Sequence, residues 1–278
     1  MGRLKKLSDI RYGPEQYRLT RAKLFSRFWE IGTSTGLQAL GSNESGSDAG
    51  EQIFSENKFR SNISLFEMPE IQDNGKIMRL KIVQAGEPVL RAQARQLTRE
   101  EIIADEIQRL IRDMHETMRD APGVGLAAPQ VGMALQLAVI EDREELLSSL
   151  PAEELAEKER EPVPFHVIIN PEITLLGDDT TDFYEGCLSL SGFSAVVPRA
   201  RRVRVAYLDE HGEPQSVEAS GWYARILQHE IDHLRGTLYI DRMESRTFTS
   251  LDNWSRFWNG KPARDVVESL SNPLGAIR

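Results

Sequence analysis

The feature of this sequence that most constrains its fold is a pair of histidines four residues apart, in the hexapeptide Gln228–His233. At 3.6 residues per turn, His229 and His233 lie on one face of a helix, close enough for both imidazoles to bind one metal ion. Glu230 lies on the adjacent face, where its carboxylate can take a proton from metal-bound water. The apolar pattern on both sides predicts the helix itself, and Gly236 is typical of its C-terminal stop. We therefore interpret this segment as a metal-binding helix rather than a helix with two structural histidines.

A catalytic site of this kind needs a third protein ligand and one open position for water. The residue six positions after His233 is Tyr239, which excludes the three-histidine pattern of the metzincins. Glu244 and Glu268 stand in no matching pattern, so Cys187 is the remaining candidate, as a strong thiolate donor between turn residues and away from an apolar core run. A lone cysteine is more often a small buried hydrophobic residue. Only its combination with the histidine pair favours the role of ligand.

A third conspicuous segment is the glycine-rich stretch Gly123–Gly132. It lacks the Gly-Lys-Ser ending of a phosphate-binding loop and the strand and acidic partner of a dinucleotide site, so both interpretations are weak. The alternative is a backbone that passes close to a substrate, with Gly123 and Gly125 allowing the approach and Gln130 offering an amide donor. A structural turn would also explain the glycines.

Composition excludes several classes of protein. The 278 residues carry 34 Lys+Arg against 43 Asp+Glu, a net charge of −9, which argues against direct DNA binding. No apolar run approaches the roughly 18 residues of a membrane span. The single cysteine cannot form an internal disulfide, which suggests a reducing compartment.

The two ends of the chain differ in character. Residues 1–30 hold eight basic and three acidic residues, and 33–50 have the composition of a linker. We expect residues 1–77 to be a poorly ordered or helical extension, either regulatory or targeting, or a product of an upstream start codon. Residues 78–278 are predicted to form the folded unit.

Within that unit, strands outnumber helices between residues 130 and 220, and the short connections show no βαβ rhythm. A capping box, Thr98 with Glu101, predicts one amphipathic helix that ends before Pro122. Further predictions are a strand and turn over 78–90, strands at 137–140, 167–169 and 202–207, an exposed acidic insertion at 141–162, and a tail at 243–278 with a packing helix around Trp254, Phe257 and Trp258. The pattern predicts an α+β domain with antiparallel sheets.

Three motifs, in this order and at this spacing, resemble the signature motifs of the peptide deformylases: Gly123–Gln130, Glu185–Ser189 and Gln228–His233. The resemblance covers about Met78 to Arg242. It implies antiparallel β-sheets around a central metal-binding helix. It also implies removal of the formyl group from N-formylmethionyl nascent peptides, with release of formate.

The resemblance also implies roles for individual residues. The metal ligands would be Cys187, His229 and His233, Glu230 would be the general acid/base, Gln130 and the Leu188 backbone N–H would donate to the oxyanion, and Val124, Gly125 and Leu126 would line the substrate cleft. It implies one divalent ion, Fe²⁺ in the cell, although such a ligand set also accepts Zn²⁺, Ni²⁺ or Co²⁺.

Other interpretations stay open at this point. A metallopeptidase or amidase could use the same helix on broader substrates, and an inactive relative could bind peptides or ribosomes, although the intact set of site residues speaks against the latter. Docking near the ribosomal exit tunnel through the C-terminal segment is a further hypothesis. The expected location is the bacterial cytoplasm, with organellar import through the basic N-terminus as the alternative.

Overall fold

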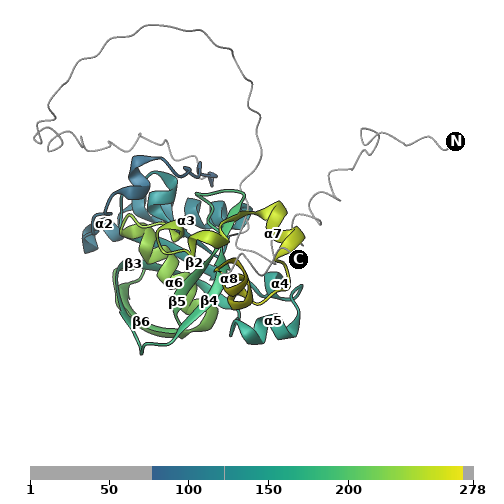
Figure 1. The fold of residues 1–278 in the computed structure, drawn as a ribbon. Helices are drawn as coiled ribbons and strands as arrows, with labels where there is room; N and C mark the ends of the chain where they lie inside the picture. Colours follow the sequence, from purple (N-terminus) through teal and green to yellow (C-terminus); the bar gives the residue numbers. More distant parts are fainter. Residues whose placement is uncertain (1–76, 122, 272–278) are drawn as a thin grey trace, which may run out of the picture. The chain divides into compact units, whose positions relative to one another are not determined.

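The computed structural model describes residues 77–121 and 123–271 (Figure 1). The predictions of an N-terminal extension over 1–77, with a linker around 33–50, fall outside the described residues except at position 77. No helix within the described ranges is long and apolar enough to span a bilayer.

Five strands form one antiparallel sheet in the order β1-β2-β3-β6-β7. Strand β2, between β1 and β3, is buried along its whole length, and its side chains alternate: Leu137 and Val139 join one apolar cluster, Ala138 and Ile140 another. Both faces of the sheet are therefore covered. The strands are β1 (Gly125–Ala127), β2 (Leu137–Asp142), β3 (Val163–Leu175), β6 (Arg202–Leu208) and β7 (Pro214–Ser220).

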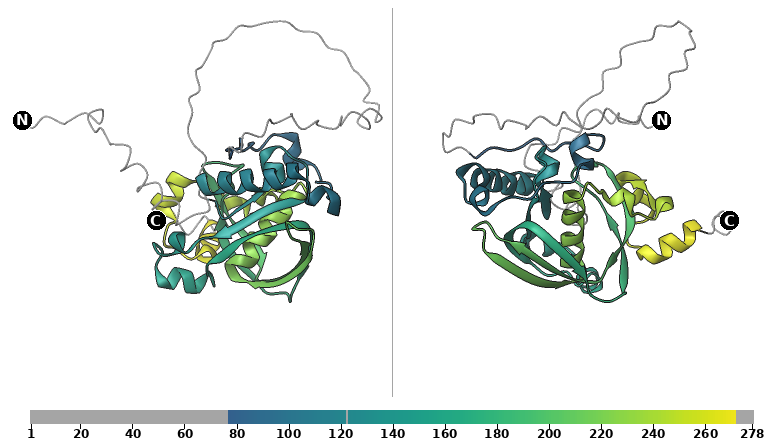
Figure 2. Two further views of the ribbon diagram at one scale, coloured as in Figure 1. Left: turned by 180° about the vertical axis from the view of Figure 1, so that it is seen from behind. Right: turned by 90° about the vertical axis from the view of Figure 1, so that its left-hand side faces the viewer.

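One helix packs on each face of this sheet. Helix α3 (Asp105–Asp120) contributes Met114 and Met118 to the cluster that contains Leu137, and α6 (Gly221–Leu234) contributes Ile226 and Leu227 to the cluster that contains Ala138. Thirteen of the fourteen residues of α6 are buried. Figure 2 shows the reason: α6 lies between the large sheet and a second, smaller one. The predicted α+β fold around a central helix is confirmed.

The second sheet has the order β4-β5-β8. Its strands are β4 (Thr180–Glu185), β5 (Phe193–Ala200) and β8 (Thr249–Ser250). Strand β4 ends at Glu185, and the turn that connects it to β5 begins with Gly186 and Cys187. Because the sheet packs over α6, this connection delivers Cys187 to the central helix.

The predicted helix over 98–121 is two helices, α2 (Arg99–Ile102) and α3. The capping box of Thr98 and Glu101 is present. The prediction of one continuous helix is wrong because Ala104 has an extended backbone, with φ −67° and ψ 146°, which interrupts the hydrogen-bond ladder. Ile103, directly before this break, is 62% exposed.

The predicted strand at Met78 is also wrong. Within the described residues the segment belongs to no sheet, since its N–H groups bond to side chains of α3: Met78 N–H to Asp113 Oδ1 at 2.8 Å and Leu80 N–H to Thr117 Oγ1 at 2.9 Å. The predicted turn follows at Gly86, with φ 111°, and leads into the 3₁₀-helix η2 (Pro88–Arg91).

The acidic segment 141–162 contains two short helices, α4 (Glu144–Leu147) and α5 (Ala152–Glu157). Contrary to the prediction, the segment is not exposed throughout, because its first two residues and Arg160 are buried. Glu141 and Asp142 complete strand β2 and are buried, and Arg160 donates two hydrogen bonds to Asp142, at 2.7 and 2.9 Å. A buried ion pair thus ties the segment back to the sheet.

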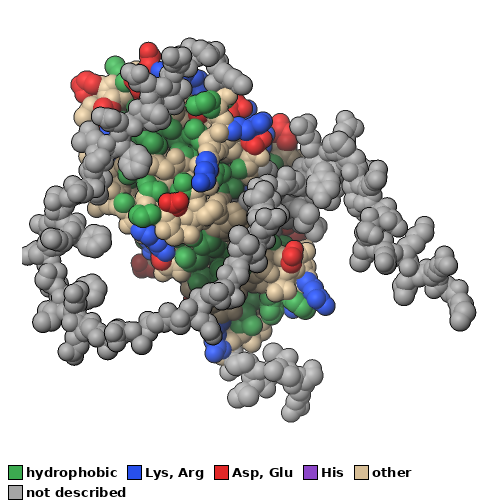
Figure 3. Space-filling view, turned by 90° about the horizontal axis from the view of Figure 1, so that it is seen from above, with side chains coloured by type: hydrophobic (Ala, Val, Ile, Leu, Met, Phe, Trp, Pro, Cys, Tyr) green, Lys and Arg blue, Asp and Glu red, His purple; other side chains and the backbone are tan. Residues whose placement is uncertain are grey.

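The C-terminal part consists of η4 (Tyr239–Asp241), η5 (Ser245–Thr247), α7 (Leu251–Phe257) and α8 (Ala263–Ser271). Of the predicted aromatic contacts, Trp254 is buried but Phe257 is 48% exposed, so only part of this pattern reflects packing. On the face shown in Figure 3, hydrophobic side chains lie among charged side chains of both signs.

Candidate metal centre

Three donor atoms from two distant segments converge beside α6. Cys187 Sγ lies 3.2 Å from His233 Nε2, which lies 3.2 Å from His229 Nε2. With bonds of about 2.0–2.3 Å, a tetrahedral ion holds its ligand atoms about 3.3–3.6 Å apart. All three residues are buried, and among the described residues they form the only group of donors close enough to hold a metal ion. The arrangement fits one divalent ion.

The surroundings of Cys187 differ from the expectation of a turn away from the core. Its side chain is 3% exposed and belongs to an apolar cluster with Ala195, Val197 and Tyr239. Burial raises the pKa of the Cys187 thiol. A positive charge at the donor atoms would oppose this effect and favour the thiolate that binds metal.

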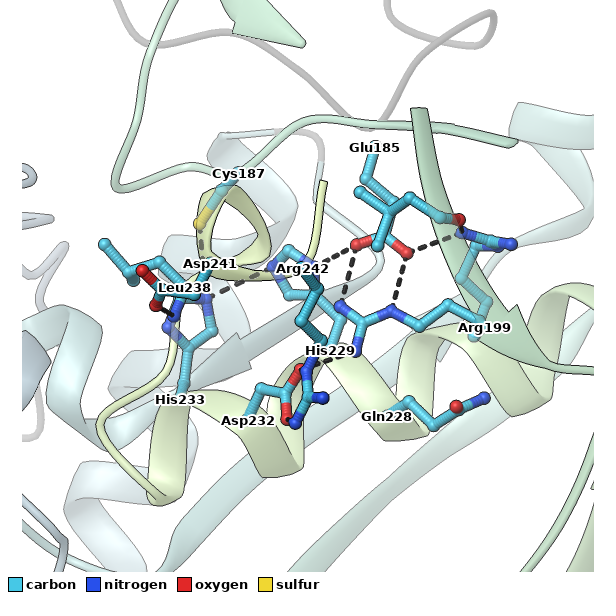
Figure 4. A network of polar contacts seen from close by, with 12 residues as sticks. Glu185, Cys187, Arg199, Gln228, His229, Asp232, His233, Leu238, Asp241 and Arg242 are labelled. Carbon is cyan, nitrogen blue, oxygen red and sulfur yellow. Dashed lines mark hydrogen bonds and ion pairs between the residues drawn. The ribbon is translucent and has the colours of Figure 1, made fainter. Parts of the chain in front are cut away.

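A buried carboxylate orients the first histidine. Glu185 Oε2 lies 3.0 Å from His229 Nδ1 (Figure 4). Because a carboxylate accepts, the ring proton belongs on Nδ1, which leaves the Nε2 lone pair directed at the other donors. Burial by itself would raise the pKa of Glu185, but Arg199, the His229 hydrogen bond and Arg225 outweigh it and hold the pKa well below its usual range.

Further charges extend this network behind the helix. Arg199 donates two hydrogen bonds to Glu185, both at 2.9 Å, and a third to Asp232. Asp232 also accepts from Arg242 at 2.7 and 2.8 Å. The sequence interpretation missed these four residues. Glu185 and Asp232 lie inside the quoted motifs, close in sequence to the proposed ligands. A charged residue in such a position was the signal that could have identified these two.

Glu230 lies on the adjacent face of α6 and is 1% exposed. Neither carboxylate oxygen accepts a hydrogen bond from any described residue. Burial raises the pKa of Glu230 well above its usual value, and Glu185 adds to the effect while Arg199 opposes it. A buried carboxyl with free oxygens and a raised pKa is suited to hold and transfer a proton.

Gly125 packs directly against this carboxyl. A Cβ atom at that position would lie 2.2 Å from Glu230 Oε1 and 2.6 Å from Cδ. The sequence suggested that this glycine lets a substrate approach. In the structure, the group that requires the missing side chain is Glu230.

Two hydrogen-bond donors lie near the cysteine. Gln130, in η3 (Ala128–Val131), accepts from the Ala127 N–H at 2.8 Å, which turns its Nε2 towards Cys187 Sγ at 3.5 Å. The Leu188 backbone N–H has no hydrogen-bond partner within residues 77–121 and 123–271. Both donors are thus available to an atom bound near Cys187.

Strand β1 lies at one edge of the large sheet and contains two of the predicted cleft residues, Gly125 and Leu126. The third, Val124, directly precedes it. The Val124 and Leu126 side chains are buried, so they point into the protein. Among the described residues, no strand pairs with the outer side of β1, so the segment offers the edge of a sheet that an extended peptide can join.

Comparison with known proteins agrees with this geometry. The family model described as polypeptide deformylase matches residues 79–248. Peptide deformylase 1A, chloroplastic, from Solanum lycopersicum is 50% identical over 172 residues, which cover 62% of each chain. Peptide deformylase 3 from Streptomyces avermitilis is 46% identical over 195 residues, 70% of this chain and 85% of that one.

The chain therefore spans less than two thirds of the tomato protein. Among solved structures, a Met-Ala-Ser-bound class I type b peptide deformylase from Acinetobacter baumannii is 31% identical, with a TM-score of 0.54 over 60% of this chain and 100% of that one. With a family model that matches most of its described residues, this chain belongs to the peptide deformylase family.

Proposed function

We propose that this protein hydrolyses the formyl group from the N-terminal formylmethionine of newly made polypeptides and releases formate. The observation that carries the proposal is the convergence of Cys187, His229 and His233 beside Glu230. The carboxylate oxygens of Glu230 accept no hydrogen bond from any described residue. Metal donors, a proton carrier and oxyanion donors within one buried site are the parts that amide hydrolysis requires.

Cys187, His229 and His233 would hold one divalent ion. When bound, it would act as a Lewis acid and lower the pKa of a water molecule towards about 7. We propose Fe²⁺ as the ion used in the cell, because the family resemblance implies it and the ligand set accepts it; Zn²⁺, Ni²⁺ and Co²⁺ are the alternatives.

Glu230 supplies the proton transfers. Its carboxylate takes a proton from the attacking water and delivers it to the amine nitrogen that leaves as the C–N bond breaks. The raised pKa suits this role, because a carboxylate whose pKa lies above its usual value takes up a proton more readily than an ordinary one and can then pass it on.

Gln130 and Leu188 stabilise the charge that develops on the formyl oxygen. The Ala127 N–H donates to Gln130 Oε1 and so fixes the orientation of the side-chain amide. The Nε2 donor therefore does not need to reorient during the reaction. A single preorganised donor of this kind typically lowers the barrier by about 3–4 kcal/mol.

The substrate peptide would extend along β1 and add to the open edge of the sheet. The Acinetobacter relative was crystallised with Met-Ala-Ser, a tripeptide that begins with methionine. By analogy, we propose that this chain binds the N-terminal methionine of its substrate next to the metal centre.

A direct test compares formyl-Met-Ala-Ser with acetyl-Met-Ala-Ser and unblocked Met-Ala-Ser, using anaerobically purified protein of known metal content. We expect formate from the first peptide only, in proportion to bound metal. Cleavage between Met and Ala would favour a metallopeptidase, and binding of the peptides without hydrolysis would favour an inactive relative.

Three proposals concern the context of the reaction. We propose that residues 78–278 are sufficient for catalysis and 1–77 are dispensable, so the chain that begins at Met78 should keep the kcat of the full chain.

We propose the bacterial cytoplasm as the location of the protein. Organellar import of a fluorescent protein fused to residues 1–77 would instead support the organellar alternative. We also propose docking near the ribosomal exit tunnel through residues 243–278, which co-sedimentation with ribosomes tests.

A further inference from the structure

We propose that the tripeptide Val83–Ala85 holds the oxyanion donors in place, with Gln84 as a positioning residue for the turn that carries Leu188. The inference rests on the proposed function, because it concerns the donors that would stabilise its transition state. Sequence interpretation treated this segment only as part of a strand, which the structure does not contain.

The tripeptide contacts both segments that carry donors. The Val83 N–H donates to the Gln130 backbone carbonyl at 2.9 Å, and the Ala85 N–H donates to the Ser189 carbonyl at 2.7 Å. Between them, Gln84 Nε2 donates to the Leu188 carbonyl at 2.9 Å. A single short segment therefore bridges the helix η3, which carries Gln130, and the turn after Cys187.

These bonds fix consecutive peptide planes of the turn. The Cys187 carbonyl accepts from the Leu190 N–H at 2.9 Å, which orients the plane that contains the Leu188 N–H. Gln84 restrains the next plane through the Leu188 carbonyl, and Ala85 restrains the one after it through the Ser189 carbonyl. With this plane and the two that follow it held, the Leu188 N–H has little freedom to rotate away from the site.

Gln84 also holds the far end of the turn. Its Oε1 accepts from the Ser191 N–H at 3.3 Å, so its amide spans the turn from Leu188 to Ser191. Donor and acceptor must both be present in one side chain, which an amide supplies and a carboxylate or a hydrocarbon does not.

The size of the effect is limited by water. Gln84 is exposed, and a surface pocket of about 410 Å³ is lined by Lys81–Glu87. Water can therefore replace the lost hydrogen bonds but cannot hold the turn in one orientation. We expect a roughly 3- to 10-fold loss of kcat, the range of one ordinary hydrogen bond.

The test uses the full chain, metal-loaded, with formyl-Met-Ala-Ser. Gln84→Met removes both hydrogen bonds at similar length and should lower kcat 3- to 10-fold, with KM and bound metal unchanged. Gln84→Glu keeps the acceptor for Ser191 but sets a carboxylate oxygen against the Leu188 carbonyl, so it should lose at least as much. Lys81→Met, exposed in the same segment, is the matched control and should stay within twofold of the wild type.

Hydrogen–deuterium exchange gives a readout that does not depend on turnover. Peptides covering residues 186–192 should exchange faster in Gln84→Met than in the wild type or Lys81→Met, with the same exchange in the remaining peptides. A lower melting temperature with unchanged kcat and local exchange would assign Gln84 a purely structural role and overturn the inference.

The inference and the proposed function fail in different ways. If the wild type releases no formate, the proposed function is wrong. If the wild type turns over and Gln84→Met keeps kcat within twofold, only the positioning role is wrong.

Discussion

Gly125→Ala is the substitution that most directly tests how the site is built. The added methyl carbon would lie 2.2 Å from Glu230 Oε1, whereas ordinary contacts begin at 3.4 Å, so the carboxyl must retreat by 3.4 − 2.2, about 1.2 Å. A reacting group displaced by about 1 Å can lose roughly 100-fold in rate. We therefore expect kcat to fall about 100-fold.

The assay should separate this displacement from loss of the metal or the fold. Formate release gives kcat and KM, metal analysis gives the occupancy of the Cys187–His229–His233 site, and thermal unfolding gives stability. Metal content should stay near that of the wild type, because the three atoms nearest to the added carbon all belong to Glu230. Overpacking of this size costs about 1–3 kcal/mol of stability.

Gly123→Ala is the matched control, two residues earlier. There the added carbon would lie 3.0 Å from Leu188 Cδ1, the end of a flexible side chain that can shift by a few tenths of an ångström. We expect its kcat within about threefold of the wild type. Equal losses in the two variants, or a Gly125→Ala variant with wild-type kcat, would refute the reasoning that Gly125 exists to seat Glu230.

Three further predictions concern the charges and ligands. Glu230→Ala should keep its metal but lose at least 100- to 10,000-fold in kcat; retention of most activity would remove Glu230 from the proton transfers. Cys187→Ser should lower metal occupancy and turnover, and unchanged values of both would rule out the cysteine as a ligand. For Glu141, burial raises the pKa, but hydrogen bonds from Arg119 and His115 outweigh it and lower the pKa below 4.5. Its stabilising contribution is therefore present above pH 4.5 and is lost as the pH falls. Glu141→Gln should lower the free energy of unfolding by about 2 kcal/mol at pH 7 and by progressively less below pH 4.5. A cost that does not depend on pH would contradict this.

Local periodicity explains which parts of the fold could be predicted. The strand at 202–207 was visible because its buried and exposed residues alternate, and α6 was visible because its apolar residues repeat at helical spacing. The break at Ala104 was not visible, because the residues on both sides keep the same helical spacing. Only the backbone conformation at Ala104, with Ile103 turned to solvent, ends α2 there.

The burial of charged residues could not be predicted from the sequence either. Glu141 and Asp142 stand in a run of acidic residues that is typical of a solvated surface, yet they end a fully buried strand. Their burial depends on cations supplied from elsewhere in the chain, Arg119 from α3 and Arg160 from beyond α5. No local pattern reports such distant partners.

The sequence by itself determined the two histidines, Glu230 and their relative placement, because a helix turns at a fixed angle per residue and four residues return to the same face. It could name Cys187 as a ligand only by elimination and resemblance. The tertiary structure alone decided that Cys187, 46 positions before His233, meets it at 3.2 Å, because the second sheet packs across α6. It likewise decided that Gly125 exists to make room for Glu230, since that contact joins two elements whose distance in sequence carries no information about their distance in space.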